Sequence, residues 1–303
     1  MRVSARRGYW AASEKELTEA ETAAATPVNV GLRTALSALL DSVNTRPVAL
    51  WTGFAKGEAE RTRVSFTWEI NAEQGAGNRD QGVGTREQGA GTREQGAGIR
   101  EQGLGNRQSG AAKPARLEIQ PIDDAGKETA PAQVIGGAPG ELPMVARFEF
   151  PGGKQRLRFT ALSKSGDLLD RWVLTQQVPD LSKAQLVLST PKLLRARNMI
   201  EWRALESNAE PSATAATKFS ATDRVLVDIE CAAPAGEAAD HTIDLLNAQG
   251  DVLRALEAPP LADGHARLQV PVASLANSTY VLRIEARAGE HRAQQWIAFR
   301  VQR

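Results

Sequence analysis

The chain has 303 residues, a formal net charge of +1 at pH 7 and a single cysteine. This length indicates two domains. The near-neutral charge argues against nucleic acid as a partner, because nucleic-acid-binding domains concentrate Lys and Arg on one surface. A single cysteine excludes a disulfide within the chain and a Cys-based metal site. No apolar stretch reaches the roughly 18 residues that a membrane-spanning helix needs, so the sequence predicts no transmembrane segment.

The N-terminal residues 1–27 contain basic side chains but lack the apolar region of a secretory signal. They predict a short strand followed by a helix that runs to about Thr26. This helix begins at a capping box formed by Ser13 and Glu16. We interpret the segment as the remnant end of a preceding domain.

A second helix is predicted at residues 31–44, where apolar side chains recur on one helical face. Beyond Pro47 the apolar period changes to two. The clearest strand is residues 62–70, whose apolar side chains alternate with Arg, Ser, Thr and Glu. This alternation is typical of a half-buried antiparallel strand, with Trp68 on the core face.

More alternating segments follow, separated by polar turns that end in or contain glycine, at 123–127 and 163–167. Such turns indicate hairpins. Many short strands without a long helix between them predict a β-sandwich. We therefore expect residues 28–190 to form a helix and a first antiparallel β-sandwich, with a disordered insert at 73–110.

The insert contains one seven-residue unit written five times at residues 73–107, from EQGAGNR to EQGLGNR. Each unit lacks the apolar seam of a coiled coil. Its two glycines cost a helix about 2 kcal/mol per unit relative to alanine. The acidic residue and the arginine of each unit cancel in charge. The tract predicts a flexible, solvated spacer of about 30 Å between two strands.

Residues 191–218 predict a linker that includes a short helix within 195–207. Residues 219–303 contain six or seven predicted strands and predict an immunoglobulin-like or fibronectin-like β-sandwich. Cys231 alternates with apolar residues and is expected to face inward as a small hydrophobe. Tyr280 follows a turn and is expected to form a tyrosine corner. The predicted fold class is mainly β, with two antiparallel sandwiches and a short helical N-terminal segment.

The sequence contains no nucleophile elbow, P-loop or dinucleotide fingerprint. His241, His265 and His291 lack the spacing of a zinc site and are interpreted as exposed turn residues. Asp123 and Asp124 lie in a turn, where aspartate accepts local backbone hydrogen bonds. We predict no catalytic, cofactor-binding or metal-binding residues, and a protein that is not an enzyme.

Six tryptophans leave a carbohydrate platform open as an alternative. Trp68 is assigned to the core, whereas Trp51 and Trp172 fit either reading. The remaining tryptophans are Trp10, Trp202 and Trp296.

The order of several stretches resembles the C-terminal half of the von Willebrand factor A-related proteins described in acidobacteria. Residues 2–11 resemble the closing strand and tail of the A-type domain. The other matching stretches are 47–69, 148–173, 178–198, 218–229, 245–253, 272–286 and 296–301.

The resemblance implies an exported protein, extracellular or periplasmic, that mediates protein interactions without catalysis. It also implies that this chain is the C-terminal piece of a longer protein. The family's A-type domain binds a divalent ion through a D-x-S-x-S loop. The nearest stretch here begins at Asp180 and Ser182 but has Ala184 in place of the second serine. We expect a turn at this stretch and assign no metal ligand to it from the resemblance.

Two functions follow from the sequence. The first is a non-enzymatic accessory module that spaces or presents a protein-binding domain at the cell envelope, with a protein partner. The second is a carbohydrate-binding sandwich that uses exposed tryptophans.

Overall fold

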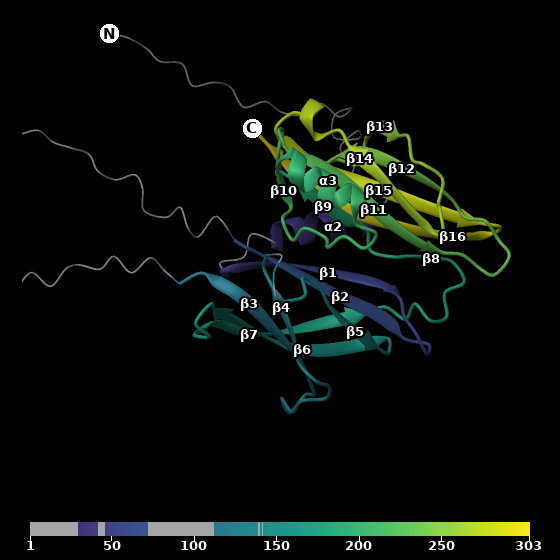
Figure 1. Cartoon of the computed structure of the whole chain (residues 1–303). Coiled ribbons are helices and arrows are strands. Elements are labelled where there is room, and N and C mark those ends of the chain that lie inside the picture. Colours follow the sequence, from purple (N-terminus) through teal and green to yellow (C-terminus); the bar gives the residue numbers. More distant parts are fainter. Residues whose placement is uncertain (1–29, 42–45, 72–111, 139, 141) are drawn as a thin grey trace, which may run out of the picture.

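The structure is a computed structural model that describes residues 30–41, 46–71, 112–138, 140 and 142–303. Its strands form two sandwiches, one above the other in Figure 1. The predicted helix at 13–26, the strand within residues 1–27 and the repeat at 73–107 lie outside the described residues.

The first sandwich is the lower one in Figure 1 and has seven strands. These are β1 (Val48–Lys56), β2 (Thr62–Ile70), β3 (Pro114–Ile122), β4 (Gln133–Gly136), β5 (Ala146–Phe150), β6 (Gly153–Ser163) and β7 (Leu168–Val178). One sheet has the order β1-β2-β5 and the other β4-β3-β6-β7, and all their pairs are antiparallel. The turns predicted at 123–127 and 163–167 are present, closed by backbone bonds from Asp123 to Lys127 and from Ser163 to Asp167.

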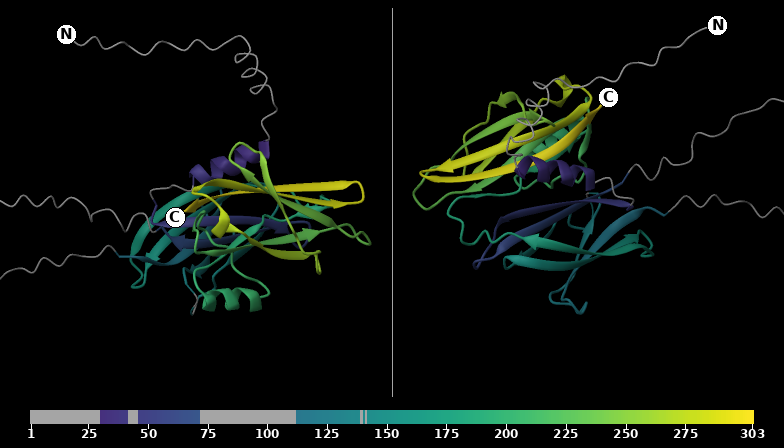
Figure 2. Two further views of the ribbon diagram at one scale, coloured as in Figure 1. Left: turned by 90° about the horizontal axis from the view of Figure 1, so that it is seen from above. Right: turned by 180° about the vertical axis from the view of Figure 1, so that it is seen from behind.

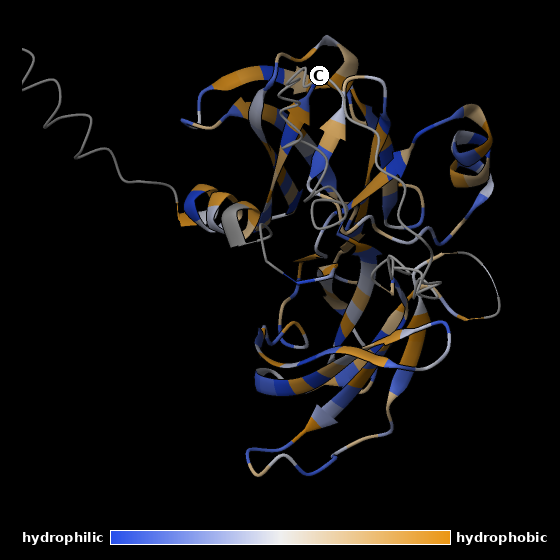
Figure 3. Cartoon of the chain, turned by 90° about the vertical axis from the view of Figure 1, so that its left-hand side faces the viewer, coloured by the Kyte–Doolittle hydropathy of each residue, from blue (hydrophilic) through white to orange (hydrophobic). Residues whose placement is uncertain are grey.

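The alternating apolar side chains predicted from the sequence form the core of the first sandwich. Phe66 contacts Phe148 and Phe159 edge to face, with ring centroids 6.2 and 5.6 Å apart. Trp68 is 2% exposed and donates a hydrogen bond to the Ile135 carbonyl, which confirms its assignment to the core. The orange and blue bands that alternate along the strands in Figure 3 are this period of two.

The second sandwich begins before residue 219, the start expected from the sequence. Its elements are β8 (Val187–Leu188), β9 (Lys192–Ala196), α3 (Met199–Ser207), β10 (Lys218–Ser220), β11 (Arg224–Ala232), β12 (Asp240–Asn247), β13 (Val252–Leu256), β14 (His265–Val270), the short 3-10 helix η2 (Val272–Ser274), β15 (Ser278–Ala288) and β16 (His291–Gln302). Strand β11 pairs with β14, β9 and β8, and the other sheet has the order β10-β16-β15-β12-β13.

Both sandwiches share one strand order. In each, the first, second and fifth main strands form one sheet, and the third, fourth, sixth and seventh form the other. The second sandwich follows this order with β9, β11, β12, β13, β14, β15 and β16. Two packed antiparallel sheets with seven main strands are the architecture that immunoglobulin-like and fibronectin-like sandwiches share, so the predicted fold class is confirmed.

The segment 191–218, expected as a linker, is built into the second sandwich. Strand β9 pairs with β11 along five residues, and β10 pairs in parallel with β16. Between them lies the predicted helix, α3, whose N-cap Asn198 accepts hydrogen bonds from the backbone of Ile200 and Glu201. The first strand of this sandwich is thus split by a helix, and sequence alternation alone does not show such a split strand.

The predicted helix at 31–44 is α2 (Val30–Asp41). The sequence groups this helix with the first sandwich, and this assignment is wrong, because its apolar face packs against the outer face of the second. Leu32, Ala35 and Leu39 form one cluster with Leu246, Val281 and Ala298. The rear view in Figure 2 shows α2 against β15 and β16. An apolar stripe predicts that a helix face is covered, but it does not identify the covering sheet.

Candidate functional site: the cleft between the sandwiches

The polar face of β2 does not face open solvent. It lies against the second sandwich and against an extended segment at residues 211–215. Ala213, Thr214 and Ala215 are between 5% and 8% exposed. The Thr67 hydroxyl donates to the Ala213 carbonyl over 2.8 Å. The polar face of this strand is therefore buried at Thr67 and partly covered at Arg63, Ser65 and Glu69.

Glu69 links three parts of this interface. Its carboxylate pairs with the Arg195 guanidinium on β9 and accepts a hydrogen bond from the Thr214 hydroxyl. On the neighbouring strand β1, the backbone N–H and carbonyl of Phe54 bond to the hydroxyl and N–H of Thr190, over 3.0 and 2.8 Å. These contacts join residues more than a hundred positions apart, and they fix the two sandwiches against each other.

A cleft with a volume of about 180 Å³ opens beside these contacts and is partly open to solvent. Its floor is the outer face of β1, β2 and β5, including Trp51, Gly53 and Ser65. Its opposite wall comes from the second sandwich, including Ser189 and His265. This volume is smaller than that of sites for drug-sized ligands, roughly 300–1,000 Å³, so the cleft has room for only a small ligand or one part of a larger one.

The charges that line the cleft are paired. The pairs are Arg63 with Glu230 at 2.7 Å, Arg147 with Glu210 at 3.0 Å and Lys192 with Asp228 at 3.3 Å. Two of these pairs, those of Arg63 and Arg147, connect the first sandwich to the second. The cleft is therefore polar, with its cations matched by carboxylates.

Trp51 lies on the floor of this cleft. Its ring covers Gly53, because a Cβ atom built on that glycine would lie 2.1 Å from the Trp51 Cη2 atom. Among the described residues, no aromatic ring or cation lies against the Trp51 indole, and its N–H has no hydrogen-bond acceptor. The indole is partly buried, and the part that lines the cleft is not stacked on another described ring.

The other described tryptophans are occupied. Trp172 stacks on Phe159, with ring centroids 5.1 Å apart, and lies under the Arg46 guanidinium. Trp202 lies under Arg224 at 5.2 Å. Trp296 donates to the Gln294 side chain, and the Arg283 guanidinium lies over its ring. Trp51 is partly buried as these three are, but it lacks such a partner, so the broad tryptophan platform weighed from the sequence reduces to Trp51.

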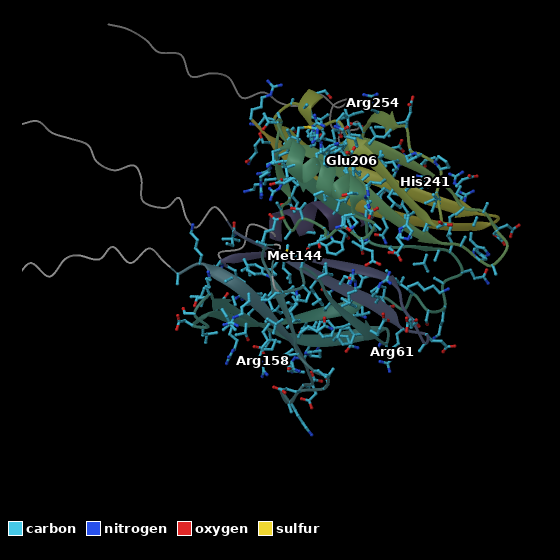
Figure 4. All side chains as sticks on the ribbon, in the orientation of Figure 1. Arg61, Met144, Arg158, Glu206, His241 and Arg254 are labelled. Atoms are coloured by element: carbon cyan, nitrogen blue, oxygen red, sulfur yellow. The ribbon has the colours of Figure 1, made fainter. Side chains whose placement is uncertain are left out.

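The three histidines do not converge. His265 begins β14 at the cleft, and His291 begins β16. His241 is half-buried on β12 instead of exposed in a turn, and Figure 4 shows it on the second sandwich. Burial lowers the pKa of His241, and the Asp240 carboxylate opposes this shift. No group of three His, Cys, Asp or Glu side chains among the described residues is arranged to hold a metal ion.

Cys231 is 6% exposed in the core of the second sandwich, as predicted. Burial raises the pKa of its thiol, so the thiolate form that reacts is disfavoured.

The stretch that begins at Asp180 is a local turn between β7 and β8, as expected. The Asp180 carboxylate accepts hydrogen bonds from the backbone and hydroxyl of Ser182. The Ser182 hydroxyl, followed by Lys183, lowers the pKa of Asp180. The Asp180 carboxylate therefore stabilises this turn.

The tyrosine corner is confirmed. The Tyr280 hydroxyl donates to the Ala276 carbonyl over 3.1 Å. Tyr280 is 6% exposed and stacks on Phe299. Its role is structural, because it ties the preceding loop to β15.

The described residues contain no helix that is long and apolar enough to cross a membrane. The fold and the cleft define a two-sandwich β protein with a polar cleft between its sandwiches. No family model and no curated protein matches the chain. Among solved structures, the fibronectin(III)-like modules of Clostridium thermocellum CbhA match with 8% identity and a TM-score of 0.18, over 80% of this chain and 86% of theirs.

A β-glucuronidase from Parabacteroides merdae matches with 9% identity and a TM-score of 0.18, over 62% of this chain and 20% of the enzyme. Likeness at this level says nothing about the function of this chain.

Proposed function

We propose that this chain is a non-enzymatic interaction module in which two fixed sandwiches present an open sheet edge to a protein partner. One observation carries the proposal. Strand β7 is an 11-residue edge strand whose only strand partner among the described residues is β6. The equivalent edge in the second sandwich, on β16, is covered by β10.

The covered edge shows how this fold accepts an added strand. Strand β10 pairs in parallel with β16 from Lys218 to Ser220. Between them, Phe219 is 1% exposed and packs edge to face on Phe299, with ring centroids 6.0 Å apart. Backbone hydrogen bonds and one buried side chain therefore hold the added strand.

The open edge of β7 has few features that prevent pairing. Natural edge strands are protected by lysine, proline, bulges or short length. Strand β7 has one register shift against β6 at its start, between Leu168 and Asp170. It contains no lysine or proline, and it exposes Leu168 at 54% and Val173 at 46%. A partner in extended conformation would gain main-chain hydrogen bonds along this edge, as in other strand-addition complexes.

A photo-crosslinking residue at Thr175, which is exposed on β7, tests this proposal in source cells. We expect a covalent adduct with a protein partner, which the added substitution Val173→Lys weakens. The matched control carries the same group at Ile200 on α3, which is 82% exposed but lies on no sheet edge. Equal adduct yields at both positions, or none at Thr175, would refute strand addition.

We further propose that the module belongs to an exported von Willebrand factor A-related protein and acts at the cell envelope. The ordered stretches that resemble this family support the proposal. An antibody to the second sandwich, applied to fractionated source cells, tests it. We expect a band near twice the mass of this chain in the envelope or periplasmic fraction, and a band near 32.5 kDa in the cytosol would contradict it.

A further inference from the structure

We propose that the cleft between the sandwiches binds a neutral sugar ring that stacks on Trp51. This site is separate from the β7 edge, and the inference goes beyond protein binding. It gives the carbohydrate alternative one specific site.

The floor of the cleft is an aromatic platform. The Trp51 indole covers Gly53, and any larger residue at that position would collide with the ring. Trp51 differs from the other described tryptophans in that no ring, cation or hydrogen-bond acceptor among the described residues occupies it. A pyranose ring has one face of C–H groups, which matches a flat indole of amphipathic character.

Hydrogen-bonding groups surround this platform. The hydroxyls of Ser65 and Ser189 line the cleft and have no hydrogen-bond partner among the described residues. Ser189 is only 5% exposed, and its backbone N–H donates to the Glu230 carbonyl over 2.9 Å, which positions the residue in the cleft wall. The Arg63–Glu230 ion pair uses one guanidinium nitrogen and one carboxylate oxygen. Further N–H donors of Arg63 and lone pairs of Glu230 can therefore bond to a ligand. Such mixed donors and acceptors match the hydroxyl groups at the rim of a sugar.

The charge balance selects a neutral ligand. A phosphate or carboxylate ligand needs an excess of cations, but Arg63, Arg147 and Lys192 each already have a carboxylate partner. A free cation ligand would need unpaired carboxylates, and those of the lining pairs are likewise engaged. A polar cleft with matched charges, lined by one indole that stacks on no other described ring, therefore favours a neutral polyhydroxylated ligand.

Titration with cellohexaose, xylohexaose and maltohexaose tests the site, with tryptophan fluorescence and the indole N–H resonances as readouts. We expect one of these glucan or xylan probes to bind and to shift the Trp51 resonance. Trp51→Ala should weaken binding at least tenfold, whereas Trp51→Phe should retain part of it. Gly53→Ala should also weaken binding, because it displaces the indole without removing it.

Trp172→Phe is the matched control and should leave binding unchanged, since Trp172 lies outside the cleft. Thermal melts of each variant separate loss of binding from loss of folding. Binding that persists unchanged in Trp51→Ala would overturn the proposal, as would the absence of any shift with all three probes. Val173→Lys on β7 should not affect sugar binding, so the two proposals fail independently.

Discussion

The two sandwiches share a strand order but differ at their edges and connections. In the first, β7 has no described strand beyond it at the edge of its sheet, and residues 72–111 lie within the connection from β2 to β3. In the second, β10 covers the equivalent edge, and residues 233–239 make the equivalent connection. The alternating strands set the same framework twice. The features from which we infer binding surfaces lie outside that framework.

The tyrosine corner gives a finer comparison. Tyr280 lies two positions before the buried Leu282 on β15, and Gln155 lies two positions before the buried Leu157 on β6. The Gln155 side chain donates to the Pro151 carbonyl four positions upstream, over 3.4 Å. Tyr280 bonds four positions upstream in the same way. In each sandwich a side chain therefore ties the preceding loop to the strand, through the Tyr280 phenol in the second and the Gln155 amide in the first.

The largest effect is expected from the core. Phe66→Ala should destabilise the chain by about 3–5 kcal/mol, because it leaves a cavity among Phe148 and Phe159. Since residues 211–215 are buried between the sandwiches, we expect both to melt in one transition at a lower temperature. Calorimetry combined with tryptophan fluorescence measures this.

Phe299→Ala is the matched control in the second core, where Phe299 is 1% exposed. It should lower the same single transition. If Phe66→Ala instead leaves a second transition at the original temperature, the sandwiches fold independently and the interface does not couple them.

The next effect concerns the interface itself. Glu69→Ala should cost about 2 kcal/mol, because it leaves the guanidinium of Arg195, whose side chain is 14% exposed, without its carboxylate. A double-mutant cycle with Arg195→Ala isolates the pair, and urea titration measures each free energy of unfolding. Glu128→Ala, which breaks the exposed pair with Arg158 inside one sandwich, is the control and should cost less than about 1 kcal/mol. If the two variants lost equal free energies of unfolding, the ion pair at the interface would stabilise the protein no more than an exposed pair does.

A smaller effect is expected at the corner positions. Tyr280→Phe should cost about 1 kcal/mol, since it leaves the Ala276 carbonyl without this donor. Gln155→Ala should cost less, because its bond is longer and more exposed. Chemical denaturation of both variants compares the two sandwiches directly. If Gln155→Ala lowered the free energy of unfolding more than Tyr280→Phe, the prediction that the Tyr280 bond contributes more would be wrong.

Much of the fold was predictable because a strand buried on one face has a period of two. The core residues Val64, Phe66 and Trp68, the two hairpin turns and the second sandwich all followed from this pattern. Tyr280 was predictable because its role depends on a local turn. The sheet against which α2 packs was not predictable, because the apolar stripe of a helix is compatible with any apolar sheet face.

The cleft was not predictable from local pattern. Its floor is the polar face of β1 and β2, which in isolation is typical of a solvated strand surface. Its wall comes from residues more than a hundred positions away, such as Ser189 and Glu230. Only one signal was present in the sequence: Trp51 is two residues from Gly53, and glycine within a strand indicates a close approach.

The smallest effect should come from the connection that most distinguishes the sandwiches in sequence. Replacing residues 73–107 with a short Gly-Ser linker should change the free energy of unfolding by about 1 kcal/mol or less, because loop-closure entropy varies only with the logarithm of length. The converse variant inserts the same repeat beside Gly236, which has a positive φ of 84° in the second sandwich's equivalent connection. Its cost should be similarly small if these connections act only as loops. A marked loss of melting cooperativity in the shortened variant, without one in the lengthened variant, would mean that the repeat itself stabilises the first sandwich.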